Sequence, residues 1–447
     1  DRDNNPIGLI NKDTLVNVGH EAGDQRNAAV AMDADGDFVI VWQEDIRDGD
    51  GKIIGGDIWG RRYNSLGQVI LTDSDHNGVI DARDNADGIF RVNDLPDGIQ
   101  WNPAVAMDPF GNFVVTWATA GQPFSYFNDV HAQLYNFRGE TVGEEFRVNE
   151  VNIPGTNAAP NGSIELNPAA AMDPFGNFVI AWDQIDEQND GIAYNTVIVA
   201  RLFDPLGNPA DDPANPGTPL PSFQVNIGDD VVTDPEHAFE TAAGGNAWQR
   251  QARNPSAAMD TQGNFIIAWE AWQDNDDDDL TGPDSYGIYF RRFLADGTPE
   301  MDDYDHQANL VITIDDDIRE GQPLVAERAE QFAFGQVNAS VGMDADGDYA
   351  IAWNGNGAVP HPVDPRGLDT VRHDPEGVWV RNFHADDGAA TPEFVGVQTR
   401  VNMTAMGIQQ FPSLGMEPDG DKIVVWNGWG VGDTMGIFAR RYDEPTD

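Results

Sequence analysis

One short phrase occurs six times in this chain, and every occurrence ends on a tryptophan. A unit repeated at this period cannot bury its apolar face alone, so it must stack on copies of itself. A residue type found in every copy is therefore expected to serve the architecture, and chemistry is expected where the copies differ. Numbered in chain order as copies one to six, the phrases read NAAVAMDADGDFVIVW at 27–42, NPAVAMDPFGNFVVTW at 102–117, NPAAAMDPFGNFVIAW at 167–182, NPSAAMDTQGNFIIAW at 254–269, NASVGMDADGDYAIAW at 338–353 and FPSLGMEPDGDKIVVW at 411–426.

Each copy predicts four short antiparallel strands. The first stretch is rich in alanine, as in PAVAMD at 103–108, and the second is β-branched and aromatic, as in FVVTW at 113–117. Between them, D-x-x-G-N/D predicts a tight turn that the aspartate caps and in which the glycine takes a positive φ. The third stretch, I/V-x-x-R-x-F/Y with glutamine for arginine in copy two, occurs at 58–63, 130–135, 198–203, 288–293, 378–383 and 437–442. The fourth, F-x-V-N or a looser form, occurs at 90–93, 146–149, 223–226 and 399–402, with a weak candidate at 310–313.

Four antiparallel strands repeated around an axis predict an all-β fold, a six-bladed β-propeller. Copy six ends at Asp443 without a fourth stretch, whereas LVN at 15–17 precedes copy one. We therefore predict that an N-terminal strand at 14–17 completes the last blade and removes an open sheet edge. An open solenoid is the alternative. The predicted domains are an N-terminal extension at 1–13 and one propeller at 14–447, with repeat cores at 27–93, 102–149, 167–226, 254–313, 338–402 and 411–443 plus 14–17.

The P-x-V-A-M-D-x-x-G-N-F-V-x-x-W core with its F-x-V-N ending resembles a repeat of large secreted or surface proteins of bacteria. The resemblance covers nearly the whole chain and rests on structural motifs. It implies a propeller and an extracellular or cell-surface location, and it brings no activity to transfer.

The chain is strongly acidic, with 76 Asp and Glu against 25 Lys and Arg and a formal net charge of −51. Such a surface repels nucleic acid and anionic membranes, and it favours divalent cations, basic partners or a saline medium. The chain has no cysteine, which excludes disulfides, thiolate metal sites and cysteine nucleophiles.

The segment DSDHNGVIDARD at 73–84 carries the sharpest functional signal. Read as a calcium loop, it offers oxygen ligands at alternate positions, with Gly78 at the sharp bend. The predicted ligands are Asp73, Asp75, Asn77, the Val79 carbonyl, Asp81 and Asp84. Such loops resemble those of dockerins and EF-hands, in which the last ligand is usually Glu rather than Asp84. A solvated acidic loop is the alternative.

Looser acidic loops follow three of the tryptophans and are weaker Ca²⁺ candidates, because flexible carboxylate loops suit hard cations. Their predicted ligands are Asp48, Asp50, Asp186, Asp190, Asp274, Asp276 and Asp278. The D-A-D-G-D segments at 33–37 and 344–348 also look metal-like, but they occupy the hairpin position of other copies and are predicted to be turns.

Recurring arginines and recurring acids predict structural pairs rather than an anion-binding ring. The arginines are Arg61, Arg201, Arg291, Arg381 and Arg440, and the acids are Asp33, Asp108, Asp173, Asp260, Asp344 and Glu417. The chain has no G-x-S-x-G, no H-E-x-x-H and no phosphate-binding glycine loop. Carboxylates are so numerous that a glycosidase pair can be neither identified nor excluded.

These observations predict a non-enzymatic, calcium-binding extracellular propeller with a structural, adhesive or matrix-assembly role. Its predicted partners are other copies of itself, which residues 1–13 could link into a filament, or a surface or matrix protein or glycan. The alternative function is that of a carbohydrate-binding or carbohydrate-cleaving propeller, resembling a lectin or a glycosidase. Turnover of a glycan would decide between the two.

Overall fold

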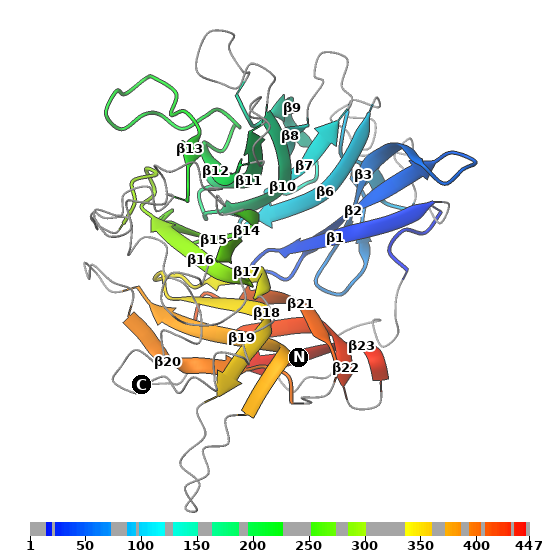
Figure 1. The fold of residues 1–447 in the computed structure, drawn as a ribbon. Coiled ribbons are helices and arrows are strands. Elements are labelled where there is room, and N and C mark those ends of the chain that lie inside the picture. The colour runs from blue at the N-terminus through cyan, green and yellow to red at the C-terminus, as the bar shows by residue number, and fades with distance from the viewer. Residues whose placement is uncertain are drawn as a thin grey trace, which may run out of the picture. The chain divides into compact units, whose positions relative to one another are not determined.

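The computed structural model describes residues 15–19, 23–72, 87–94, 98–120, 128–150, 163–186, 195–226, 252–273, 285–300, 336–359, 372–385, 393–403, 407–430 and 433–443 (Figure 1). These residues form strands and turns without any helix, so the prediction of an all-β fold is confirmed. None of them forms a helix capable of spanning a membrane. The chain divides into two compact units: unit 1 is 1–187 with 199–223, and unit 2 is 188–198 with 224–447.

Every copy of the phrase forms the first two strands of its own antiparallel group. Copy one contains β1 (Asp24–Met32), β2 (Phe38–Arg47), β3 (Ile53–Tyr63), β4 (Val69–Ile70) and β5 (Ile89–Arg91); copy two contains β6 (Ile99–Met107), β7 (Phe113–Ala120), β8 (Asp129–Tyr135) and β9 (Thr141–Arg147); copy three contains β10 (Ser163–Met172), β11 (Phe178–Asp186), β12 (Asn195–Phe203) and β13 (Phe223–Gln224). Copy four contains β14 (Arg253–Met259), β15 (Phe265–Gln273) and β16 (Ser285–Phe293); copy five contains β17 (Val337–Met343), β18 (Tyr349–Val359), β19 (Arg372–His384) and β20 (Glu393–Arg400); copy six contains β21 (Gln409–Met416), β22 (Lys422–Gly430) and β23 (Asp433–Tyr442).

The strands of each copy pair in chain order. Copies two, three and five each form four antiparallel strands, as predicted, and three strands are described in copies four and six. In copy one, both β4 and β5 pair with β3. A single parallel bridge between Gly56 and Ile99 joins β3 to β6, so copies one and two share one sheet. The candidate for a fourth strand of copy four, at 310–313, lies outside the described residues.

The second strands of copies two to five form the core, because they are covered on both faces. Trp117 and Trp353 are fully buried, and Trp182 and Trp269 are 1% exposed. Neighbouring copies share these cores. In unit 2, Ile266 of copy four packs in one cluster with Trp353 of copy five. Stacking of copies, which the repeat predicted, thus supplies the burial that one copy lacks.

The V-N pair that ends a copy clamps its third strand. In copy two, Val148 donates its backbone N–H to the Val130 carbonyl at 2.8 Å, and the Asn149 Oδ1 accepts the Val130 N–H at 3.0 Å. Equivalent bonds join Val92 and Asn93 to Ile58, Val225 and Asn226 to Ile198, and Val401 and Asn402 to Val378. The F-x-V-N motif is therefore a structural clamp.

The recurring arginines are structural, but the prediction that they pair with the recurring aspartates is wrong. Arg201 donates to the Val148 carbonyl of the preceding copy at 2.8 Å, and Arg61 donates to the Val16 carbonyl at 2.7 Å. Bonds of the same kind join Arg291 to Val225 at 3.0 Å and Arg440 to Val401 at 3.1 Å. The aspartates are instead engaged by their own turns, as in Asp173, which accepts the backbone N–H of Phe175. Each turn directs its own backbone N–H groups at the aspartate that opens it, so these carboxylates are satisfied locally.

Candidate functional site

The first strand of every copy contains a bulge where the backbone turns left-handed. The residue with positive φ is the first of the repeated phrase: Asn27, Asn102, Asn167, Asn254, Asn338 and Phe411, with φ between 48° and 59°. Pairing with the second strand skips at each of these positions, as between Trp101 and Ala104. Asparagine tolerates this conformation better than most residues, which accounts for its recurrence.

In unit 1 the bulge side chains form one hydrogen-bonded run across three copies. Asn27 donates its amide to Asn102 Oδ1 at 2.5 Å, and Asn102 donates to Asn167 Oδ1 at 2.6 Å. Asn167 in turn donates to Asp183 Oδ2 at 2.6 Å. Gln43 Oε1 accepts from the Asn27 amide at 3.0 Å and from the Asn102 backbone at 3.1 Å. We call these five residues the amide belt; β1, β6 and β10, which carry its asparagines, lie side by side (Figure 1).

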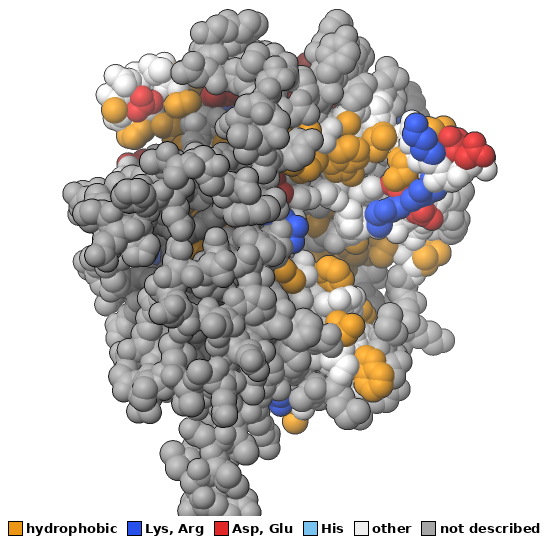
Figure 2. All heavy atoms as spheres, in the orientation of Figure 1, with side chains coloured by type: hydrophobic (Ala, Val, Ile, Leu, Met, Phe, Trp, Pro, Cys, Tyr) orange, Lys and Arg blue, Asp and Glu red, His pale blue; other side chains and the backbone are white. Residues whose placement is uncertain are grey.

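One end of the amide belt is charged. Gln43 donates to Asp45 Oδ1 at 2.6 Å, and Asp45, whose side chain is fully buried, also accepts from Arg26 and from Arg47 at 3.1 Å. Arg47 further contacts Asp24 at 2.8 Å. Figure 2 shows positive and negative side chains gathered at this end of β1 and β2. The buried Asp45 is therefore compensated and holds Gln43 in place.

Unit 2 has a shorter run of the same design. Glu270 is 1% exposed and accepts from Arg253 at 2.9 Å, from the Asn254 amide, and from the Asn338 backbone at 3.2 Å. Asn338 donates to Asn354 Oδ1 at 2.8 Å. Glu270 and Asp183 both directly follow a core tryptophan, where copies one, five and six carry an amide and copy two carries alanine. The copies thus differ in charge at this position while keeping the bulge.

The amide belt is a row of fixed donors and acceptors at a surface. Asn27 is exposed and Asn102 and Asn167 are half-buried, whereas Gln43 and Asp183 behind them are buried. The buried members fix the orientation of the exposed amides, so a ligand would lose little side-chain entropy in binding them. Such a row is suited to hydroxyl groups, which both donate and accept.

The predicted calcium loop at 73–84 lies outside the described residues. So do Asp190, Asp274, Asp276 and Asp278 of the weaker candidates and the N-terminal extension at 1–13. Asp186 ends β11, and only its backbone is described. Asp48 caps its own turn, where Oδ1 accepts the backbone N–H of Asp50 at 3.0 Å and of Lys52 at 2.9 Å. Calcium binding at these residues stays a prediction.

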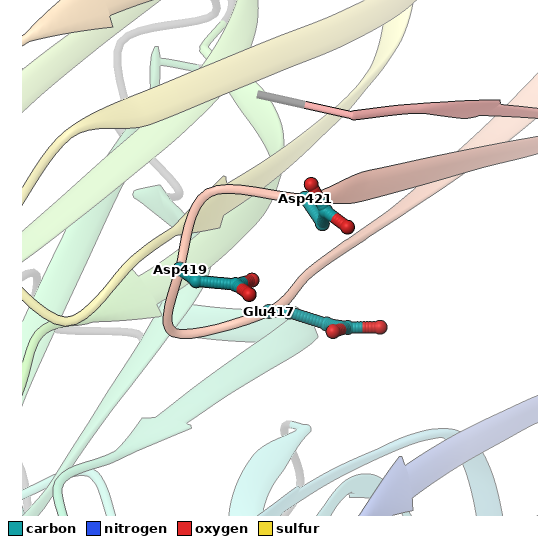
Figure 3. Close-up of side chains that lie close together, drawn as sticks. All are labelled: Glu417, Asp419 and Asp421. Carbon is teal, nitrogen blue, oxygen red and sulfur yellow. The ribbon is translucent and has the colours of Figure 1, made fainter. Parts of the chain in front are cut away.

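The D-A-D-G-D segments are turns, as predicted. Asp33 and Asp344 each accept the backbone N–H of the residue four positions later at 2.9 Å. In the described part of the chain, one set of acidic groups has ligand atoms mutually within 4.8 Å: Glu417, Asp419 and Asp421, in the turn between β21 and β22 (Figure 3). Asp421 there already accepts from Arg441 at 2.7 Å. This turn is the copy-six form of the common hairpin.

No family model and no curated protein matches this chain. Among solved structures, it is similar to an α-L-arabinofuranosidase from Fusarium graminearum in complex with an iminosugar inhibitor, with a TM-score of 0.47, 10% identity, and coverage of 93% of each chain. It is also similar to a Penicillium chrysogenum α-L-arabinanase complexed with arabinobiose, with a TM-score of 0.45, 10% identity, and coverage of 94% of this chain and 93% of that one. An ulvan lyase of polysaccharide lyase family PL25 gives a TM-score of 0.42, 11% identity, and coverage of 92% and 77%.

These three proteins are carbohydrate-active enzymes, and the prediction of a non-enzymatic protein is contradicted by them. That prediction was based on the repeat, the calcium loop, the lack of cysteine and the absence of local catalytic motifs. Glycan-cleaving carboxylates come from separate strands and loops and leave no such motif, so their absence carried little weight. Sequence reasoning also missed the amide belt. The asparagine that opens five of the six phrases was the available signal.

Proposed function

We propose that this chain is a polysaccharide-acting propeller that holds its glycan along the amide belt. The observation that carries the proposal is the continuous run from Gln43 to Asp183, in which exposed amides are fixed by buried partners. Sugar hydroxyls exchange donor and acceptor roles, and an amide row offers both. This is the second of the two functions that the sequence predicted.

Charge selects the substrate class. A net charge of −51 disfavours the approach of a uronate or sulfated polymer, so we propose a neutral polysaccharide. A neutral glycan lacks the acidic proton beside a carboxylate that an eliminative cleavage removes. Hydrolysis of the glycosidic bond by a pair of carboxylates is therefore the proposed reaction.

A binding and hydrolysis screen tests this function. Linear arabinan, arabinoxylan and mixed-linkage β-glucan serve as neutral probes, and ulvan serves as the anionic one. Asn102→Gly keeps the positive φ but removes the amide, and it should weaken binding about tenfold. Asn215→Ala, at an exposed turn after β12 where the amide donates to Asp212, is the matched control. Cleavage of ulvan alone, or no binding to any neutral probe, would contradict the proposal.

We also propose that residues 14–17 complete copy six and close a ring of six blades. Two observations support closure. Val16 accepts from Arg61 as Val148 accepts from Arg201, which gives 15–17 the place of a fourth strand before copy one. Ile437 of copy six is 72% exposed, whereas its equivalents Ile58, Val130, Ile198, Ile288 and Val378 are fully buried.

The absence of native cysteine makes closure easy to test. In copy five Trp379 pairs with Arg400, two residues before the clamping asparagine, so Leu15 would pair with Phe438 in a closed ring. Leu15→Cys with Phe438→Cys should oxidise to a monomer of increased mobility on a non-reducing gel. Disulfide-linked oligomers would place the strand on another molecule of the protein. The absence of any crosslink would contradict closure. Leu15→Cys alone is the control.

Two further predictions complete the proposal: calcium at 73–84 and an extracellular or surface location. An ion that binds only the folded chain stabilises it by about 2.7 kcal/mol at a concentration one hundred times its Kd. A chelator should therefore lower the melting temperature, and Asp73→Ala with Asp75→Ala should remove most of that effect. Equal melting temperatures with and without chelator would count against calcium.

A further inference from the structure

The turn end of unit 1 exposes a group of large apolar side chains. Phe110 and Phe175 occupy the same position in the hairpins of copies two and three and are 71% and 73% exposed. Phe137, at 55%, and Leu206, at 69%, stand at the adjoining turns of the same two copies. We call these four residues the apolar tips. They lie at the opposite end of the strands from the amide belt.

The two hairpin phenylalanines are specific to copies two and three, whereas an exposed leucine like Leu206 also occurs in copy one, as Leu66. Where copies two and three carry Phe110 and Phe175, the other four carry Asp35, Gln262, Asp346 and Asp419. The turn itself does not require phenylalanine, because the polar versions make the same backbone bonds. Since the architecture is satisfied without them, these aromatics serve something that copies two and three alone contact.

The tips are rigidly mounted and adjacent. Asp108 accepts the backbone N–H of Phe110 at 2.9 Å, and Asp173 accepts that of Phe175 at 2.8 Å. Phe137 donates its backbone N–H to Asn112 of the neighbouring turn at 3.0 Å. A Cβ built on Gly176, beside Phe175, would lie 3.9 Å from Asp108 Oδ2, so the turns of the two copies adjoin.

The hairpins that carry Phe110 and Phe175 are also less charged than the corresponding hairpin of copy one. The hairpins of copies two and three each contain one carboxylate, Asp108 and Asp173, and both are buried and hydrogen-bonded. The corresponding hairpin of copy one contains three, at Asp33, Asp35 and Asp37. At the adjoining turns Arg138 lies over the Phe137 ring, 5.2 Å from its centroid, and Asp204 caps the turn of Leu206. In a chain of net charge −51, the two phenylalanine hairpins, whose carboxylates are buried, match an uncharged partner.

We propose that the apolar tips are a second binding site for a neutral glycan chain, on which sugar rings stack. This inference rests on the proposed function and extends it, because it adds a second place, apart from the amide belt, where the protein holds the polymer. Two identical aromatic tips on successive copies present a periodic surface to a periodic ligand. Sugar rings present C–H faces that pack on aromatic rings, and a rigid platform costs little entropy to occupy.

Native affinity electrophoresis in linear arabinan, arabinoxylan and mixed-linkage β-glucan tests the site. Phe110→Asp with Phe175→Asp copies the residues of copies one and five, so the fold tolerates it. This double variant should lose about tenfold in affinity for the retained polymer. Its hydrolysis of short oligosaccharides from that polymer should equal the wild type. Phe110→Tyr with Phe175→Tyr keeps the aromatic faces and should retain binding.

The outcomes separate the two proposals. A double aspartate variant retained as strongly as the wild type overturns the second site and leaves the proposed function standing. Phe110→Leu with Phe175→Leu tests whether apolarity alone suffices. If this variant is retained like the wild type, stacking is wrong. If light scattering shows that the wild type self-associates and the aspartate variant does not, the tips bind a second molecule of this protein. A wild type that neither binds nor cleaves any neutral probe overturns both proposals.

Discussion

In unit 1 the turn end and the amide belt end of the same strands satisfy their polar groups in different ways. At the turn end the hairpin carboxylates are satisfied within their own copy, as Asp173 is by three donors of its own hairpin. The bonds between copies there run to backbone carbonyls instead, as from Arg62 to Phe137 and Arg138. At the belt end every copy depends on the next, since Asn102 bonds to residues of copies one and three. Because the carboxylate of each hairpin is satisfied within its own copy, the residues at the tips of the turns can vary between copies. Bonds shared between copies fix the asparagine of each bulge, so the copies vary instead at the residue that follows the core tryptophan.

The largest expected effect lies at the turn end, because a buried carboxylate there satisfies three donors. Asp173 is 3% exposed and accepts from Phe175, from the Asn177 backbone and from the Asn177 amide. Asp173→Ala should lower the free energy of unfolding by about 3 kcal/mol, since the donors lose a charged acceptor. Urea unfolding measures it. Asp204→Ala, at the exposed turn after β12, is the matched control and should cost about 1 kcal/mol. Equal losses would show that burial does not matter there.

The features that could be predicted from the sequence follow the same division between contacts within a copy and contacts between copies. The hairpins and the buried tryptophans were predictable, because each depends on a short pattern. The partners of the arginines were not, because Arg201 reaches a carbonyl of another copy, Val148, far away in the chain. The amide belt was missed for the same reason. A single asparagine at the start of the phrase gives no sign of its partners, and only the stacking of copies brings Asn27, Asn102 and Asn167 into one hydrogen-bonded run.

A smaller effect is expected at the belt end, where a left-handed residue also bonds across copies. Asn102→Ala should cost about 2 kcal/mol, because alanine is strained at φ 50° and the links to Asn27 and Asn167 are lost. Asn102→Gly should cost about half of that, since only the bonds are lost. Thermal and urea unfolding check both.

Copy six offers the reverse experiment. Phe411 already has φ 52° and is 58% exposed, so its backbone holds the bulge without an amide. Phe411→Asn should raise stability by a few tenths of a kcal/mol, because asparagine suits this conformation. If Asn102→Ala proved harmless and Phe411→Asn proved harmful, the bulge would be set by its surroundings alone.

The last comparison is between two forms of the same turn. In copies two, three and four the aspartate that opens the hairpin accepts a hydrogen bond from an asparagine amide, as Asp173 does from Asn177. In copy five Asp348 takes that position, and burial together with the carboxylates of Asp346 and Asp348 raises the pKa of Asp344 to about 7. Because this pKa is raised above its unfolded value, the folded state binds more protons between pH 4 and 7. The contribution of Asp344 is therefore full below pH 4 and is lost as the pH rises to 7.

Asp348→Asn should repair this turn. Its Oδ1 can still accept the Ala385 N–H, as Asn264 Oδ1 accepts that of Ala295 at 3.2 Å, and its amide can donate to Asp344. The loss of His384 as an ion-pair partner opposes this gain only when the histidine is protonated. We expect the variant to be about 1 kcal/mol more stable at pH 8 and no more stable at pH 5, after allowance for solvent screening. Unfolding curves at the two pH values decide the point: a stabilisation independent of pH would assign the gain to the new hydrogen bond and remove the titration of Asp344 as its cause.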